Sequence, residues 1–185
     1  MRMIVAGLVV AVGLAVTPAG ASPMVRGFGP YLLGAKANSV LKTGGFRRTT
    51  DPSIHGKVDV FVKDISAPLN GEPYPAKVYV YVTNGVVGGV VVKWNGTEFD
   101  TVSEWQQVYH GLWNQLVKTY GAIVVGSVSE DDPGDDGMAY VFHDAAGNLV
   151  AAGTSTDAHF DITIIYESAA FAAMQKNAPK PTITY

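Results

Sequence analysis

The chain has 185 residues, a formal net charge of −3 and 16% charged residues, against roughly 25% in an average soluble domain. Hydrophobic residues make up 48% of it, and Lys and Arg together number 13. This composition excludes a disordered tail, a coiled coil and a basic nucleic-acid binder. The absence of cysteine excludes disulfides, thiolate metal sites and a thiol nucleophile, so stability must come from an apolar core.

The first segment, residues 1–21, has the pattern of a cleaved signal peptide. Arg2 supplies the positive start, residues 4–16 are uncharged and apolar, and Ala19-Gly20-Ala21 is a small-residue cleavage site. The apolar stretch is shorter than the ~20 residues of a membrane span, and Pro18 follows it. We therefore expect cleavage after Ala21 and export to a periplasm or the medium, with no transmembrane segment in the mature chain.

The region after the signal peptide predicts an extended arm and then a short N-terminal helix. Residues 22–30 are rich in Gly and Pro, which favours the arm. Residues 31–43 hold an apolar set that is typical of a short helix, and Gly44-Gly45 would end it.

The middle of the chain predicts strands. Residues 58–64 and 77–83 place valines at alternate positions, the spacing of strands with one apolar face. Asn84-Gly85 predicts a tight hairpin turn before the strand 86–94, which is apolar on both faces and therefore central in a sheet. An alternative use of this valine-rich strand is self-assembly through an exposed edge.

Two local features modify this region. Gly88-Gly89 permits a bulge or the close approach of another segment. Residues 70–75 predict a loop, because Pro73 and Pro75 cannot donate hydrogen bonds to a sheet. Tyr74 lies in this loop and is a candidate binding residue.

The strongest helix signal follows at residues 101–120. Thr101 and Glu104 have the spacing of a capping box, and Gly121 is a stop signal. The polar face includes His110 and few charges, which makes His110 a candidate contact residue. The apolar face occupies about half of the helix circumference. Its residues are Trp105, Val108, Tyr109, Leu112, Trp113, Leu116, Val117 and Tyr120.

The C-terminal third predicts a meander and a short helix. The strands are expected at 138–143, 149–155 and 159–166, and residues 168–185 are expected to form a short helix over 168–176 and a tail. The fold class is therefore α+β over residues 22–167, with a mainly antiparallel sheet of about six to eight strands. One long amphipathic helix packs on one face of this sheet, and the short N-terminal helix adds to it.

A weak internal repeat offers an alternative layout. Leu41-Lys42-Thr43-Gly44-Gly45 and Val117-Lys118-Thr119-Tyr120-Gly121 each end a predicted helix and precede strand-like segments. Two helix-plus-meander halves, 30–96 and 100–167, would follow. This arrangement resembles the tandem helix-and-four-strand plan of secreted β-lactamase-inhibitor proteins. Because the repeat rests on three matched residues, a single domain is the preferred prediction.

An acidic segment, residues 129–137, is the most unusual feature of the sequence. Its crowded carboxylates repel one another, and a hard cation such as Ca²⁺ would relieve that repulsion. Pro133-Gly134 and Gly137 are also the residues of a solvated hairpin turn, which the sequence favours. The acidic side chains are candidate binding residues, and the aspartates are weak candidate metal ligands. They are Glu130, Asp131, Asp132, Asp135 and Asp136.

Catalytic motifs are missing from the chain. It contains no G-x-S-x-G elbow, no phosphate-binding loop of the G-x-x-x-x-G-K-[ST] type and no H-E-x-x-H zinc helix. The predicted topology does not bring the histidines into one metal site, although His159 and Asp161 share a strand face. The sequence therefore does not predict an enzyme or a resident cofactor.

The function expected from these observations is that of a non-catalytic binding or envelope-associated module. Its contacts would be the acidic turn, the loop at Tyr74 and the helix face at His110, and its partner an envelope or secreted protein. The alternative is a small hydrolase or a calcium-binding protein that uses residues 129–137, or His159 with Asp161. The aromatic residues also suggest a surface on which sugars could stack. This hypothesis requires that Trp94 and Trp113 are exposed.

Overall fold

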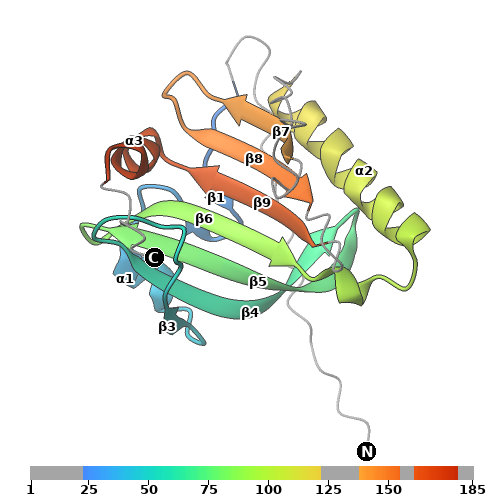
Figure 1. The fold of residues 1–185 in the computed structure, drawn as a ribbon, viewed down its shortest axis with the longest axis horizontal. Coiled ribbons are helices and arrows are strands. Elements are labelled where there is room, and N and C mark those ends of the chain that lie inside the picture. Colours follow the sequence, from blue (N-terminus) through green and yellow to red (C-terminus); the bar gives the residue numbers. More distant parts are fainter. Residues whose placement is uncertain (1–22, 122–137, 155–160, 179–185) are drawn as a thin grey trace, which may run out of the picture.

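The computed structural model describes residues 23–121, 138–154 and 161–178, whose arrangement Figure 1 shows. These residues form an α+β fold on a seven-stranded antiparallel sheet, and a second sheet pairs β1 (Gly27–Phe28) with β2 (Tyr31–Leu32). The predicted fold class and strand number are confirmed. The large sheet contains β3 (Arg47–Thr49), β4 (Asp59–Leu69), β5 (Glu72–Thr83), β6 (Val86–Trp94), β7 (Met138–His143), β8 (Leu149–Thr154) and β9 (Ile162–Glu167). The helical segments are α1 (Ala37–Leu41), the short η1 (Gly96–Glu98), α2 (Val102–Tyr120) and α3 (Ala169–Asn177).

The strand order is β3-β4-β5-β6-β9-β8-β7, and every neighbouring pair is antiparallel. β6 therefore has a partner on both sides, as its two apolar faces predicted, and offers no free edge for self-assembly. Because β9 returns beside β6, the strands before and after α2 belong to one continuous sheet.

One face of this sheet, here called the core face, holds the main apolar core. The alternating valines of β5 point to it, and Val78 and Val80 are fully buried. The core face continues across β6, β9 and β8 and shares its core with α1, α2 and the two-stranded sheet. Its buried members on the central strands include Val90, Val92, Trp94, Val150, Ile162 and Ile164.

The β4–β5 hairpin corrects the prediction of a loop at residues 70–75. β5 begins at Glu72 and pairs with β4 along its whole length, across a turn in which Asn70 and Gly71 have φ values of 52° and 91°. β6 pairs with β5 only from Ala76 onward, so the other edge of β5 has no strand beside Pro73 and Pro75. A proline is tolerated at such an edge because no ladder hydrogen bond is lost there. The hairpin extends past β6 and bends toward α2 (Figure 1).

The long helix α2 has the predicted limits. Thr101 Oγ1 accepts a hydrogen bond from the Glu104 N–H at 3.1 Å, and the Glu104 carboxylate accepts one from the Asp100 N–H at 2.9 Å. Gly121, with a φ of 91°, ends the helix. Three residues on one side are buried in the main core, so the amphipathic pattern confirms which side faces the sheet: Val108, Leu112 and Leu116.

The N-terminal helix predicted over residues 31–43 is not supported over that length. Tyr31 and Leu32 form β2, and only the five residues of α1 are helical. The chain before α1 instead hydrogen-bonds to the start of β6: the Gly34 N–H donates to Val87 O, and the Val87 N–H donates to Ala35 O. These bonds to a distant segment hold the chain extended where local apolar spacing predicted a helix.

The opposite face of the sheet, here called the α3 face, is covered at one end by α3. Phe171 is 1% exposed and packs with Val60 and Tyr81 in a second, smaller core. The Phe171 ring lies over Gly88 and Gly89 of β6, where a bulge interrupts the register between β5 and β6. Of the two features that these glycines permit, a bulge or a close backbone approach, the bulge is present, and the group that lies on it is a side chain.

A buried carboxylate fastens the N-terminal arm to the turn between β7 and β8. Asp144 is 8% exposed and accepts hydrogen bonds from the backbone N–H groups of Val25, Ala146 and Asn148, each at 2.9 Å. The Asn148 side chain donates a further bond at 3.0 Å. Burial raises the pKa of Asp144, but these hydrogen bonds outweigh it, so the net pKa lies below the ordinary value.

Replacement of Asp144 by alanine is expected to cost about 2–3 kcal/mol of unfolding free energy at neutral pH, because buried N–H groups lose a charged acceptor. The folded-state pKa of Asp144 is lowered, so this stabilisation is present above about pH 4 and is lost as the pH falls through the folded-state value. Urea unfolding of both proteins at a series of acid pH values measures the contribution of Asp144 to the free energy of unfolding. The gap between wild type and Asp144→Ala should narrow in acid, and a constant gap would contradict the assignment.

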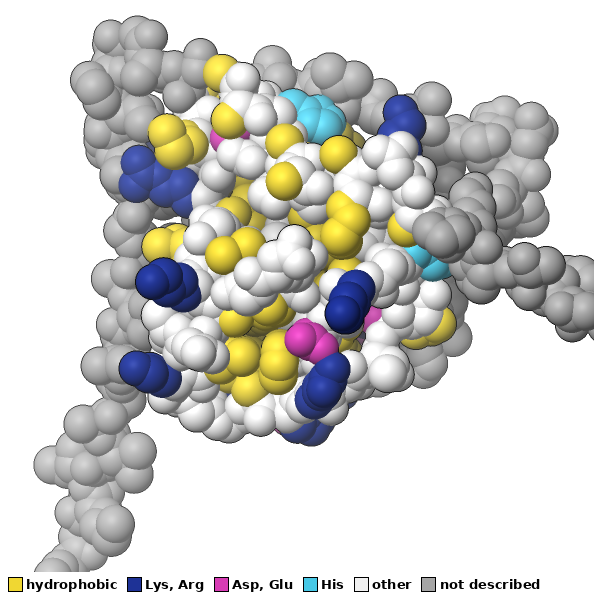
Figure 2. Space-filling view, turned by 90° about the vertical axis from the view of Figure 1, so that its left-hand side faces the viewer, with side chains coloured by type: hydrophobic (Ala, Val, Ile, Leu, Met, Phe, Trp, Pro, Cys, Tyr) yellow, Lys and Arg dark blue, Asp and Glu magenta, His cyan; other side chains and the backbone are white. Residues whose placement is uncertain are grey.

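Few large apolar side chains are exposed among the described residues. The exposed ones are Met24, Leu32, Val86 and Val102. On the side shown in Figure 2, Lys and Arg side chains surround smaller areas of apolar surface, and few carboxylates are visible. No described helix is long and apolar enough to cross a membrane.

Candidate functional site

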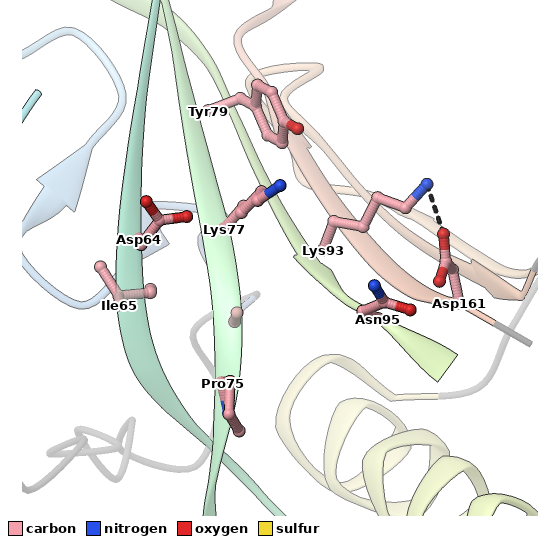
Figure 3. A pocket seen from close by; sticks show the side chains of 9 residues that line it. Asp64, Ile65, Pro75, Lys77, Tyr79, Lys93, Asn95 and Asp161 are labelled. Carbon is pink, nitrogen blue, oxygen red and sulfur yellow. Dashed lines mark ion pairs between the residues drawn. The ribbon is translucent and has the colours of Figure 1, made fainter. Parts of the chain in front are cut away.

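A hollow of about 400 Å³ lies on the α3 face, in the part where β4, β5 and β6 carry charged side chains (Figure 3). Strand alternation places these charges here, because Asp64, Lys77 and Lys93 are cross-strand neighbours on the face opposite the core. The lining residues are Asp64, Ile65, Pro75, Ala76, Lys77, Tyr79, Lys93, Asn95 and Asp161.

At one side of the hollow, Lys93 is held by a carboxylate that is itself fixed. Lys93 Nζ lies 2.5 Å from Asp161 Oδ2, and Asp161 Oδ1 accepts a hydrogen bond from the Gly96 N–H at 2.9 Å. Asp161 is 8% exposed, whereas the Lys93 side chain is 45% exposed. Asp161 therefore anchors the Lys93 side chain while leaving part of it open to solvent.

At the other side, the carboxylate of Asp64 is paired as well. Arg47 of β3 donates to Asp64 Oδ2 at 2.9 Å, and both side chains are more than half exposed. Lys77 stands between the two pairs, opposite Asp64 on β4 and opposite Lys93 on β6. Among the described residues, no carboxylate lies within ion-pair distance of Lys77.

The walls of the hollow combine apolar and hydrogen-bonding groups. Figure 3 shows the side chains of Tyr79 and Lys77 side by side above β5, whereas the Lys93 side chain extends away from them to Asp161, with Asn95 below it and Ile65 beside Asp64. The described lining includes no histidine, serine or threonine. The charged, hydrogen-bonding and apolar groups of this lining can bind and orient a small molecule.

Two of the predicted binding residues lie outside this hollow. Tyr74 is in strand β5, not in a loop, and its hydroxyl donates to the Glu104 carboxylate at 3.2 Å while its ring packs on Phe99. Burial, and to a smaller extent the neighbouring Glu104 carboxylate, raise the pKa of Tyr74. The neutral hydroxyl of Tyr74 therefore donates a hydrogen bond that connects the β4–β5 hairpin to α2. His110 is exposed on α2 beside the Tyr109 ring.

The remaining predicted site residues lie outside the described part of the chain. They are Glu130, Asp131, Asp132, Asp135 and Asp136, so calcium binding by this segment stays a prediction. His159 also lies outside it, and Asp161, its proposed partner, pairs with Lys93. In the described residues, no group of three or more His, Asp or Glu side chains is arranged to hold a metal ion.

Trp94, which the sequence offered as a possible sugar-stacking residue, is not available for that role. This side chain is 1% exposed and lies edge-on to Phe28, with ring centroids 6.2 Å apart. Trp113 is partly buried against the main core. Among the described residues that line the hollow, Tyr79 supplies the aromatic ring.

Sequence reasoning missed the hollow, although one signal was present. Each of the strands β4, β5 and β6 has a charged residue among apolar ones, namely Asp64, Lys77 and Lys93. Charges that align on adjacent strands indicate a polar stripe across a sheet. Comparison of the chain with protein families, with curated proteins and with solved structures gives no match.

Proposed function

We propose that this protein is an exported, non-catalytic binding module and that its ligand site is the hollow on the α3 face. The observation that carries the proposal is the fixed charge arrangement around Lys77, in which Arg47–Asp64 and Lys93–Asp161 form an ion pair on either side. Export is inferred from the signal-peptide pattern of residues 1–21.

The burial of Asp161 distinguishes this arrangement from ordinary surface charges. Exposed ion pairs contribute about 0–1 kcal/mol to stability, whereas withdrawing a carboxylate from water carries a cost. Asp161 meets that cost with two partners, and one of them is the half-exposed Lys93 at the rim of the hollow. Such an arrangement fixes a cation where a ligand would meet it, which supports a binding role for the hollow.

The two faces of the sheet differ in a way that also favours this position. The core face is filled by α1, α2 and the two-stranded sheet, and α3 with Phe171 seals one end of the α3 face. In the described part of the chain, the charged end of the α3 face is therefore a hollowed surface that the large sheet offers to a ligand.

A fragment screen by ¹H–¹⁵N NMR on the purified protein tests the proposal. Binders are expected to shift the backbone amide signals of Lys77, Tyr79 and Lys93. Tyr79→Leu, which keeps an apolar side chain but removes the ring and hydroxyl, should weaken binding about 3- to 10-fold, the loss of one aromatic contact. Gln107→Ala on the exposed side of α2 is the control and should change nothing. Binders that map away from β5 and β6, or no binders at all, would overturn the proposed site.

A further inference from the structure

The charge balance around the hollow defines the chemistry of the ligand. Among the described residues, the hollow is lined by two cations, Lys77 and Lys93, and by two carboxylates, Asp64 and Asp161. Arg47 of β3 lies beside the hollow and pairs with Asp64, so the cluster with Arg47 included has one positive charge in excess. The two ion pairs assign that excess to Lys77. This local sign is opposite to the net charge of −3 that the whole chain carries.

The register of the sheet makes this excess costly in the absence of a ligand. Lys77 lies directly opposite Lys93 on the neighbouring strand. Like charges in such cross-strand pairs are destabilising, since their Cβ atoms are about 4.5–5.5 Å apart. Asp161 pairs with Lys93. Asp64 lies opposite Lys77 on β4 but pairs with Arg47, so no described carboxylate forms an ion pair with Lys77. An anion bound between the two ammonium groups would remove the repulsion.

The groups around Lys77 indicate which kind of anion fits. Lysine ammonium groups act as compact point charges that bind oxyanions from several directions. The Tyr79 hydroxyl and the Asn95 amide line the same hollow and can donate to further oxygens of the anion. The Tyr79 ring and Pro75 supply apolar surface for the rest of a compact molecule.

Building on the proposed function, we infer that the hollow binds a small organic molecule with a single oxyanion group, a carboxylate or a phosphoryl group, through Lys77 and Lys93. The oxyanion lies between the two ammonium groups, and an apolar or aromatic body lies against Tyr79. Because the cations are partly exposed, binding weakens as ionic strength rises.

A matched set of small probes tests the inference on the purified protein by NMR titration. The probes are benzoate, phenyl phosphate, the neutral amide benzamide and the cation benzylamine. Benzoate or phenyl phosphate is expected to shift the amides of Lys77 and Lys93, benzamide to bind at least tenfold more weakly, and benzylamine not to bind. The stronger of the two anions identifies the oxyanion as carboxylate or phosphoryl.

Two lysine variants complete the test. Lys77→Gln should weaken anion binding at least tenfold, whereas Lys42→Gln, the same change at an exposed position outside the hollow, should leave it unchanged. Equal binding of benzamide and benzoate at the hollow would overturn the oxyanion inference and leave the proposed function standing. If neither these probes nor any molecule of the fragment screen binds there, both are wrong.

Discussion

Replacement of Trp94 by alanine is expected to lower the free energy of unfolding by about 3–5 kcal/mol. Trp94 is the largest of the fully buried side chains and lies at the end of β6 in the main core. Its ring meets Phe28 edge-on, and its indole N–H donates to the Ala67 carbonyl at 3.3 Å. The alanine variant loses this packing and leaves a cavity between the sheet and the N-terminal arm. Urea unfolding followed by circular dichroism measures the change.

Two variants control for this result. Trp94→Phe keeps an aromatic ring in the core and should cost less than the alanine variant. Val102→Ala removes an apolar side chain that is 53% exposed, and it should stay within about 0.5 kcal/mol of wild type. A loss below about 1 kcal/mol for Trp94→Ala would contradict the burial of this ring, because such a site would have to collapse almost completely.

Some elements could be predicted because a few neighbouring residues decide them. Asn84-Gly85 forms the predicted hairpin turn, with positive φ values of 52° and 75° at its two residues. Thr101 caps α2 at the predicted position, and Gly121 ends the helix. In each case the side chain or the glycine backbone meets the requirement of the turn or helix end without help from distant segments.

Other elements depend on contacts that the local sequence does not contain. Pro73 and Pro75 lie in β5 because β6 ends before reaching them, which only the sheet topology determines. Residues 31–43 form two short elements because Gly34 and Ala35 hydrogen-bond to the β5–β6 hairpin. Local spacing favoured the wrong structure at both places, since tertiary hydrogen bonds outweighed it.

The candidate site also combines features that the local sequence reveals with features that only the tertiary structure determines. Its charged residues are visible singly in the sequence, but their alignment requires the register of three strands. The tight turn at Asn70-Gly71 places Asp64 opposite Lys77. From the turn at Asn84-Gly85 alone, Val92 would face Lys77, and the bulge at Gly88 shifts the register so that Lys93 does. Without that bulge, Lys93 would point to the core face, and the paired lysines would not exist.

The bulge therefore links the site to the packing of α3. At Gly88 the chain carries an additional residue in β6 relative to β5, between the pairs Tyr81–Gly89 and Val82–Val87. Phe171 of α3 lies directly on this point and fills the space that a side chain at position 88 would need. The ring thus stabilises the register on which the alignment of Lys77 with Lys93 depends.

Phe171→Ala is accordingly expected to lower the free energy of unfolding by about 3–5 kcal/mol, the cost of removing a fully buried phenylalanine. Phe171 is 1% exposed, and its ring lies 5.9 Å from that of Tyr81. Urea unfolding measures the loss, and hydrogen exchange should show faster exchange at the Ser168 N–H, which bonds to Gly88 O. Lys176→Ala, at an exposed position on the same helix, is the control and should be nearly neutral.

A second substitution separates the contact at the bulge from the general loss of α3 packing. An added Cβ at Gly88 would lie 2.6 Å from Phe171 Cδ2, so Gly88→Ala should cost about 1–3 kcal/mol through overpacking. In the Phe171→Ala variant the ring that the added Cβ would clash with is absent. The loss of unfolding free energy caused by Gly88→Ala should therefore largely disappear in that variant. The double-mutant cycle then gives a coupling energy well above the ~0.5 kcal/mol expected for independent sites. If the losses of unfolding free energy for Gly88→Ala and Phe171→Ala are additive, Phe171 does not pack on the bulge. The contact with Phe171 would then not explain the register that places Lys93 opposite Lys77.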